Sequence, residues 1–110
     1  TQHGVFVGTP HDCSPEQVAL EELDERSDIY TLGLVIFEMA TGRRPFEAET
    51  VAELLAMQRS NPPPDPKSIS TAIPGELSAI ILRCLAKDPG DRLASAPELE
   101  EALRRVADNQ

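Results

Sequence analysis

Residues 27–42, SDIYTLGLVIFEMATG, contain the longest apolar run of the 110-residue chain. Apolar side chains would lie on nearly every side of a helix from Ile29 to Ala40, which is typical of a helix buried in a core. The β-branched residues in this run also allow a buried strand. The length of the run and its Thr41-Gly42 ending favour a helix, because glycine commonly follows the last helical residue. The stretch therefore predicts a buried central helix.

Helix starts are predicted on both sides of this stretch. In a capping box, a Ser or Thr is followed three residues later by Glu or Gln, and the two side chains bond each other's backbone N–H groups. A short polar side chain, Ser27 or Asp28, is expected to cap the central helix itself. Three capping boxes occur elsewhere: Ser14–Gln17, Thr50–Glu53 and Ser95–Glu98.

The other helices follow from apolar spacing. Pro74 is expected to start a helix whose apolar residues recur three and four positions apart. Four prolines within 61–66, NPPPDP, instead predict an extended, polyproline-type loop, since proline cannot continue a helix. The fold is therefore expected to be all-α, with an N-terminal loop, one short helix from Pro15 to about Glu21, and four main helices.

The charge of the chain limits the class of partner. Nineteen Asp and Glu outnumber ten Lys and Arg, for a formal net charge of −9. Nucleic acid and anionic membrane surfaces are disfavoured as partners, because both require clustered positive charge. A basic peptide or protein is electrostatically acceptable. The alternative interpretation is that the charge only keeps the domain soluble.

Cysteine and histidine give no sign of a disulfide framework or a metal site. Cys13 and Cys84 form no C-x-x-C pair, and neither has a histidine at metal-ligand spacing. Cys84 falls on a predicted apolar helix face and is expected in the core, whereas His3 and His11 are expected in solvated loops. We therefore expect no bound metal, and a reducing, cytoplasmic setting.

Four motifs occur in order along the chain: GTP…SPEQ at 8–17, SDIYTLG at 27–33, TGRRPF at 41–46 and CLAKDPGDR at 84–92. Together they resemble the C-terminal, helical lobe of a eukaryotic-type Ser/Thr protein kinase, and most of all its bacterial branch, from about 8 to 106. The resemblance divides the chain into two parts. Residues 1–27 would be the end of the activation segment, the substrate loop and a short helix, and residues 28–107 the helical subdomain.

The resemblance implies a substrate-binding role for the first motif. Gly8, Thr9 and Pro10 would form the floor beneath the substrate peptide, with Thr9 bonding near the catalytic aspartate; the alternative is an ordinary turn. A fixed loop suits phosphoryl transfer, because the acceptor hydroxyl must be held in line with the γ-phosphate. The resemblance also pairs Glu16 with Arg92, whose planar guanidinium can hold a carboxylate through two parallel bonds.

The central helix carries the other residues that the resemblance implies. Asp28 would accept hydrogen bonds from the catalytic loop, a role compatible with helix capping. Val35 and Met39 would form a shelf under the nucleotide-binding core, or simply pack. Glu38 would contact a basic residue of the substrate, or belong to a buried ion pair. Thr1 lies where activation-loop phosphorylation sites occur, which makes it a candidate phosphosite.

The kinase elements that handle ATP are absent from these residues. The Gly-rich loop, the V-A-I-K lysine, H-R-D-x-x-x-x-N and D-F-G are expected to precede Thr1 in a larger protein, together with ATP and Mg²⁺. We therefore expect no catalytic residue in this chain, and no activity from it alone. The predicted function is part of an ATP-dependent Ser/Thr protein kinase acting on protein or peptide substrates.

One departure from the family pattern leaves room for an alternative function. A tyrosine usually follows the Gly-Thr-Pro triplet by two positions, but here the sequence is His11-Asp12-Cys13. The alternative is a noncatalytic helical scaffold, or an interaction module derived from a pseudokinase, which would use the helix at 51–58 and its acidic surface. Intact H-R-D and D-F-G motifs upstream would favour the enzyme.

Overall fold

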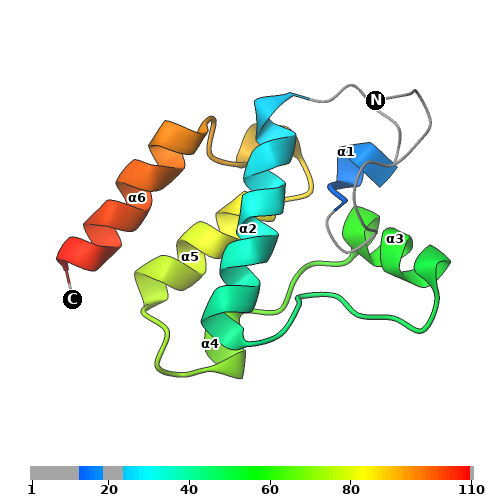
Figure 1. The fold of residues 1–110 in the computed structure, drawn as a ribbon, viewed down its shortest axis with the longest axis horizontal. Coiled ribbons are helices and arrows are strands. Elements are labelled where there is room, and N and C mark those ends of the chain that lie inside the picture. The colour runs from blue at the N-terminus through cyan, green and yellow to red at the C-terminus, as the bar shows by residue number, and fades with distance from the viewer. Residues whose placement is uncertain (1–12, 19–23, 110) are drawn as a thin grey trace.

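The computed structural model describes residues 13–18 and 24–109, and these are helical with no strand among them (Figure 1). The elements are α1 (Pro15–Val18), α2 (Glu25–Thr41), α3 (Val51–Ser60), α4 (Pro66–Ile69), α5 (Gly75–Cys84), the 3₁₀-helix η2 (Pro89–Asp91) and α6 (Ala96–Asp108). The predicted all-α class and the four main helices are confirmed within this part of the chain.

Helix α2 lies at the centre of the molecule. Helices α5 and α6 pack on one side of it, and α1 and α3 pack together on the other (Figure 1). Helix α4 contacts both α2 and α5 near the C-terminal end of α2. Helix α1 and the segment that follows α5 both reach the N-terminal end of α2, where Glu16 contacts Ser27 and Arg92 contacts Arg26.

The start of α2 differs from the prediction. Asp24 is the N-cap, and its carboxylate accepts a hydrogen bond of 2.9 Å from the Arg26 N–H. The expectation that Ser27 or Asp28 caps this helix was wrong, because helical geometry already begins at Glu25 and both residues lie within the first turn. At the other end, Gly42 has a φ of 78° and donates its N–H to the Glu38 carbonyl, as a left-handed glycine cap does.

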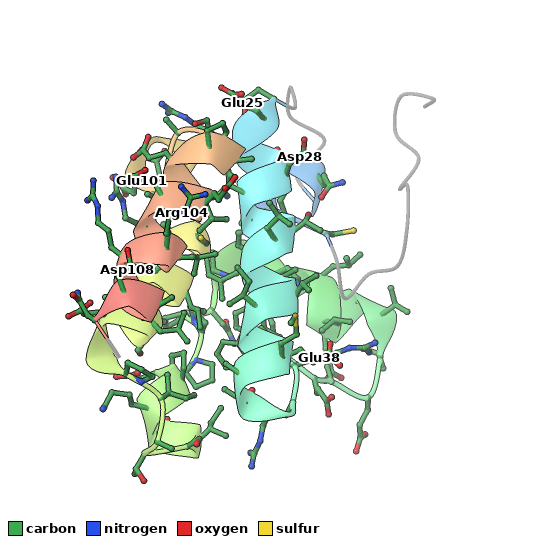
Figure 2. All side chains as sticks on the ribbon, turned by 60° about the vertical axis from the view of Figure 1, so that its left-hand side comes forward. Glu25, Asp28, Glu38, Glu101, Arg104 and Asp108 are labelled. Atoms are coloured by element: carbon green, nitrogen blue, oxygen red, sulfur yellow. The ribbon has the colours of Figure 1, made fainter. Side chains whose placement is uncertain are left out.

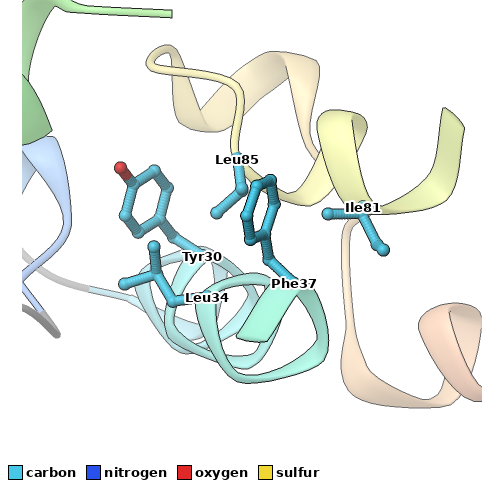
Figure 3. Packing of buried hydrophobic residues seen from close by; sticks show 5 residues of the cluster. All are labelled: Tyr30, Leu34, Phe37, Ile81 and Leu85. Carbon is cyan, nitrogen blue, oxygen red and sulfur yellow. The ribbon is translucent and has the colours of Figure 1, made fainter. Parts of the chain in front are cut away.

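The core forms where α2 crosses α5. Buried residues of α2 meet Ile81 and Leu85 in one cluster (Figure 3). Gly33 permits the close approach of the two helices, because a Cβ atom at this position would lie 2.6 Å from the Cβ atom of Cys84. Cys84 is fully buried, as predicted, and burial raises the pKa of its thiol to about 11. The α2 residues in Figure 3 are Tyr30, Leu34 and Phe37.

The proline-rich connection contains a helical turn that was not predicted. The loop prediction for 61–66 was wrong at its end, where α4 begins at Pro66. Proline costs little at the first helical position, because its missing N–H would have no partner there. Asp65 caps this turn by accepting a 3.0 Å hydrogen bond from the Lys67 N–H, and it also accepts one from the Ser78 hydroxyl.

Capping boxes predicted the helix starts correctly. Ser14 and Gln17 bond each other's backbone N–H groups at 2.7 and 3.3 Å, and so form a reciprocal box at α1. Thr50 and Ser95 accept hydrogen bonds at the starts of α3 and α6. None of the helices in the described ranges is long and apolar enough to span a membrane.

Candidate functional site

Glu16 and Arg92 lie in contact although they are 76 residues apart in the chain. The Nη1 and Nη2 atoms of Arg92 donate to the two carboxylate oxygens of Glu16 at 2.6 and 2.8 Å. Both side chains are almost completely buried, with 0% of the Arg92 side chain and 5% of the Glu16 side chain exposed. This two-pronged geometry is the strongest form of an Arg–carboxylate interaction.

Arg92 uses every N–H group of its guanidinium. Besides its two bonds to Glu16, it donates to backbone carbonyls in two other segments. Its planar group also lies 4.9 Å from the centre of the Tyr30 ring. Five donors meet five acceptors, which fixes the side chain in one position. The carbonyls belong to Arg26 (2.9 Å), Ala86 (2.7 Å) and Lys87 (3.3 Å).

The environment keeps Glu16 ionised. Burial alone would raise the pKa of this carboxyl group, but the hydrogen bonds from Arg92 and Ser27 outweigh it and hold the pKa below its usual value. The Ser27 hydroxyl donates to Glu16 at 2.7 Å from the first turn of α2. Three segments, α1, the start of α2 and the stretch ending at Arg92, are therefore joined at one buried carboxylate.

Beside this pair lies a polar group that the sequence patterns did not predict. The Tyr30 hydroxyl donates to the Gln58 side-chain oxygen at 2.6 Å, and the Lys87 ammonium donates to the same hydroxyl at 3.3 Å. Lys87 belongs to the quoted CLAKDPGDR motif, so its position was visible in the sequence. Its partners are about 30 or more residues away, and no local pattern indicates them.

The α2 residues that were predicted to contact the rest of a kinase lie on the surface. Asp28 is exposed in the first turn (Figure 2), and Val35 and Met39 are 46% and 80% exposed. Leu32, at 39% exposure, lies four residues after Asp28 and adds to the same helix face. This face is an apolar strip with a carboxylate at one end.

Glu38 takes part in a surface ion pair. Its carboxylate lies 3.7 Å from Nε of Arg44, and both side chains are about half exposed. The alternative interpretation, a buried ion pair, was therefore wrong, because Glu38 points away from the core near the end of α2 (Figure 2). An exposed pair of this kind leaves its carboxylate accessible to a partner.

Several predicted positions fall outside the described residues. They are Thr1, His3, Gly8, Thr9, Pro10 and His11. Among residues 13–18 and 24–109, no group of three His, Cys, Asp or Glu side chains could hold a metal ion.

Residues 1–104 match the model of the protein kinase domain. The chain belongs to the protein kinase family. The match confirms the resemblance drawn from the four motifs, and the helical fold agrees with a kinase C-terminal lobe without its N-terminal lobe. Glu16 and Arg92 thus join the first and the last of the four motifs in space.

Bacterial Ser/Thr protein kinases are among the relatives of this kinase segment. It is 41% identical over 104 residues to the serine/threonine-protein kinase Pkn1 of Myxococcus xanthus, covering 94% of the chain and 15% of the relative. It is 36% identical to PksC of Streptomyces coelicolor, covering 94% and 19%. It is 39% identical to PknB of Mycolicibacterium smegmatis, covering 100% and 18%. The chain therefore spans less than a fifth of the length of these curated relatives.

Proposed function

We propose that this chain is the substrate-receiving helical platform of an ATP-dependent protein kinase that phosphorylates serine and threonine in proteins. The observation that carries the proposal is the buried bond between Glu16 and Arg92. This bond fastens α1 to the helical body just after the segment with Gly8, Thr9 and Pro10. Enzymes catalyse phosphoryl transfer mainly by positioning the acceptor hydroxyl against the γ-phosphate. An ion pair that fixes α1 next to the substrate loop would therefore help to hold the acceptor in place.

The exposed face of α2 supports the second part of the proposal. Leu32, Val35 and Met39 present apolar surface that a soluble protein usually covers. Asp28 adds an exposed carboxylate at the N-terminal end of this strip. The catalytic loop and the nucleotide-binding core of the same kinase would cover the strip, and loop N–H groups would bond Asp28. Glu38 would attract a basic residue of the substrate.

ATP and Mg²⁺ would be bound by another part of the protein. The elements that hold nucleotide and metal in kinases do not occur in this sequence. The chain supplies the acceptor side of the reaction: it binds the protein substrate and orients the hydroxyl group. The domain division proposed is 1–27 for the substrate loop and short helix, and 28–107 for the supporting helices.

The test uses the full-length protein, radiolabelled ATP, Mg²⁺ and a Ser- and Thr-containing acceptor protein. We expect labelled phosphate on the acceptor. Thr9→Ala should lower kcat/KM by about 10- to 100-fold, since a small misplacement of the acceptor has effects of this size. Thr71→Ala, an exposed turn threonine, is the matched control and should change little.

Two outcomes would contradict the proposal. Failure of the wild-type protein to transfer phosphate to any acceptor would favour the scaffold alternative. Equal effects of Thr9→Ala and Thr71→Ala on kcat/KM would show that the substrate loop does not take part in positioning the acceptor.

A further inference from the structure

Lys87 joins three parts of the fold through its ammonium group. Its Nζ atom lies 2.8 Å from the Gln58 carbonyl oxygen, 3.2 Å from the Met57 carbonyl oxygen and 3.3 Å from the Tyr30 hydroxyl. An ammonium group has three N–H donors and no acceptor, so these three oxygens account for all of them. Lys87 therefore holds α3 and α2 from a segment that follows α5.

The hydrogen bonds around Tyr30 have a fixed direction. The hydroxyl accepts from Lys87, so its own proton is available for the Gln58 side-chain oxygen, 2.6 Å away. Tyr30 and Gln58 are both almost completely buried, at 0% and 1% exposure. Gln58 is thus bonded twice to the same group of side chains, once through its carbonyl and once through its amide oxygen.

The position of Lys87 suits the end of a helix. Met57 and Gln58 lie in the last turn of α3, where the helix dipole is negative. The Met57 carbonyl accepts from the Asn61 N–H at 2.9 Å as well as from Lys87. The ammonium also lies 4.4 Å from the centre of the Phe46 ring and 5.6 Å from that of Tyr30, within range of cation–π attraction. Burial and the nearby Arg92 charge lower the pKa of Lys87 to about 8, so the group stays mainly charged at neutral pH.

This group of side chains is continuous with the Glu16–Arg92 pair. Arg92 donates to the Lys87 carbonyl at 3.3 Å and lies against the Tyr30 ring, 4.9 Å from its centre. Helix α3, which Lys87 holds, packs in turn against α1, which carries Glu16. Helix α1 is therefore held directly by Arg92 and indirectly, through α3, by Lys87.

We infer that Lys87 is a positioning residue for the protein substrate: it fixes α3 against α2, and α3 in turn fixes α1, the helix that follows the proposed substrate loop in the sequence. The inference rests on the proposed kinase function for its kinetic consequences. Its structural part, the coupling of α1 to Lys87 through α3, does not depend on catalysis.

The kinetic test is made in the full-length protein with Lys87→Met, which keeps side-chain length and removes the charge. The KM for the acceptor protein should rise about tenfold, as expected when a charged hydrogen-bonding group is lost. The KM for ATP should stay within about twofold, because nucleotide binding does not use this segment. Lys67→Met is the matched control, since Lys67 also donates to a backbone carbonyl, that of Ile73, but belongs to α4.

Two further variants keep the test decisive if Lys87→Met fails to fold. Tyr30→Phe keeps the ring against Arg92 and removes only the hydroxyl that links Lys87 to Gln58. Lys87→Arg keeps the charge and should restore part of the acceptor affinity. Tyr30→Phe should raise the acceptor KM in the same direction as Lys87→Met, by about threefold.

Hydrogen exchange measures the structural part without catalysis. Backbone amides of α1 and α3 should exchange faster in Lys87→Met and Tyr30→Phe than in the wild type, and those of α6 should not. A lower kcat with both KM values unchanged would indicate only a loss of folded enzyme and would overturn the inference. So would unchanged exchange in α1. If the wild type transfers no phosphate, the proposed function fails, and the exchange result still decides the coupling.

Discussion

Replacing Arg92 by methionine tests the central claim that one buried ion pair fastens α1 to the helical body. The guanidinium is fully buried and its five N–H groups meet five acceptors on four residues. Methionine fills much of the volume but leaves the Glu16 carboxylate buried without a countercharge. Breaking a buried pair in this way costs about 3–5 kcal/mol. That is a large part of the roughly 5–15 kcal/mol by which a domain is stable.

Urea unfolding followed by far-UV circular dichroism at neutral pH measures this loss. Arg83→Met is the matched control, because Arg83 lies 3.9 Å from Glu98 with both side chains about half exposed. An exposed pair contributes about 0–1 kcal/mol. Adding Glu16→Gln to Arg92→Met should recover stability, since the stranded charge is removed. Equal losses for Arg92→Met and Arg83→Met would refute the reasoning, as would a double variant less stable than Arg92→Met alone.

Four other predictions concern acid, the glycine within α2, the glycine that caps its C-terminal end, and its exposed face. Because the hydrogen bonds from Arg92 and Ser27 outweigh burial and lower the pKa of Glu16 below the usual value of a glutamate, the contribution of this group to stability is present above that usual pKa and is lost as the pH falls through the lowered pKa; Glu16→Gln should flatten the acid side of a stability–pH curve. Gly33→Ala should cost about 1–3 kcal/mol in thermal unfolding, because the new Cβ atom would lie 2.6 Å from the Cys84 Cβ atom and the helices must separate. In Gly42→Ala the new Cβ atom would meet no atom within 4 Å, so the loss of about 1–2 kcal/mol in unfolding free energy would come only from the φ of 78°. A loss larger than that of Gly33→Ala would contradict this explanation. Met39→Gln should leave the melting temperature of the isolated chain unchanged and reduce its self-association in light scattering, since the side chain is 80% exposed.

Local signals predicted most helix boundaries. A capping box depends on residues three positions apart, and Ser14 with Gln17 forms the bonds that their spacing indicates. Local capping signals gave the wrong residue at the start of α2, where Asp24, Ser27 and Asp28 all have short polar side chains that could cap a helix. Ser27 is excluded as a cap because its hydroxyl bonds Glu16, a partner 11 residues away, and Asp24 caps instead.

Composition misled in the proline-rich connection. Counting prolines predicts an extended loop, but Pro66 follows Asp65, and an aspartate before a proline is also a helix start. The Asp65 carboxylate has a second donor in the Ser78 hydroxyl of α5, which only the folded structure provides. A tertiary contact therefore supports a helical turn that the local sequence left open.

The candidate site likewise contains residues that the sequence predicted and residues that it did not. The pairing of Glu16 with Arg92 was expected only from the kinase motifs, since nothing in local spacing connects residues 76 positions apart. The contact between Lys87 and Gln58 was not predicted, because charged and amide side chains are ordinarily assigned to solvent. Their burial depends on Tyr30 and on the end of α3, which meet only after the helices have packed.

The separation of Glu16 from Arg92 also bears on how the protein is made. A ribosome that has incorporated Glu16 must add 76 more residues before the matching arginine exists. At roughly 5–20 residues per second, this interval lasts several seconds. For most of it, α1 has no permanent anchor while the apolar central helix is already synthesised, and exposed apolar surface of this kind favours aggregation. A message truncated before the codon for Arg92 would yield a polypeptide that never leaves this vulnerable stage.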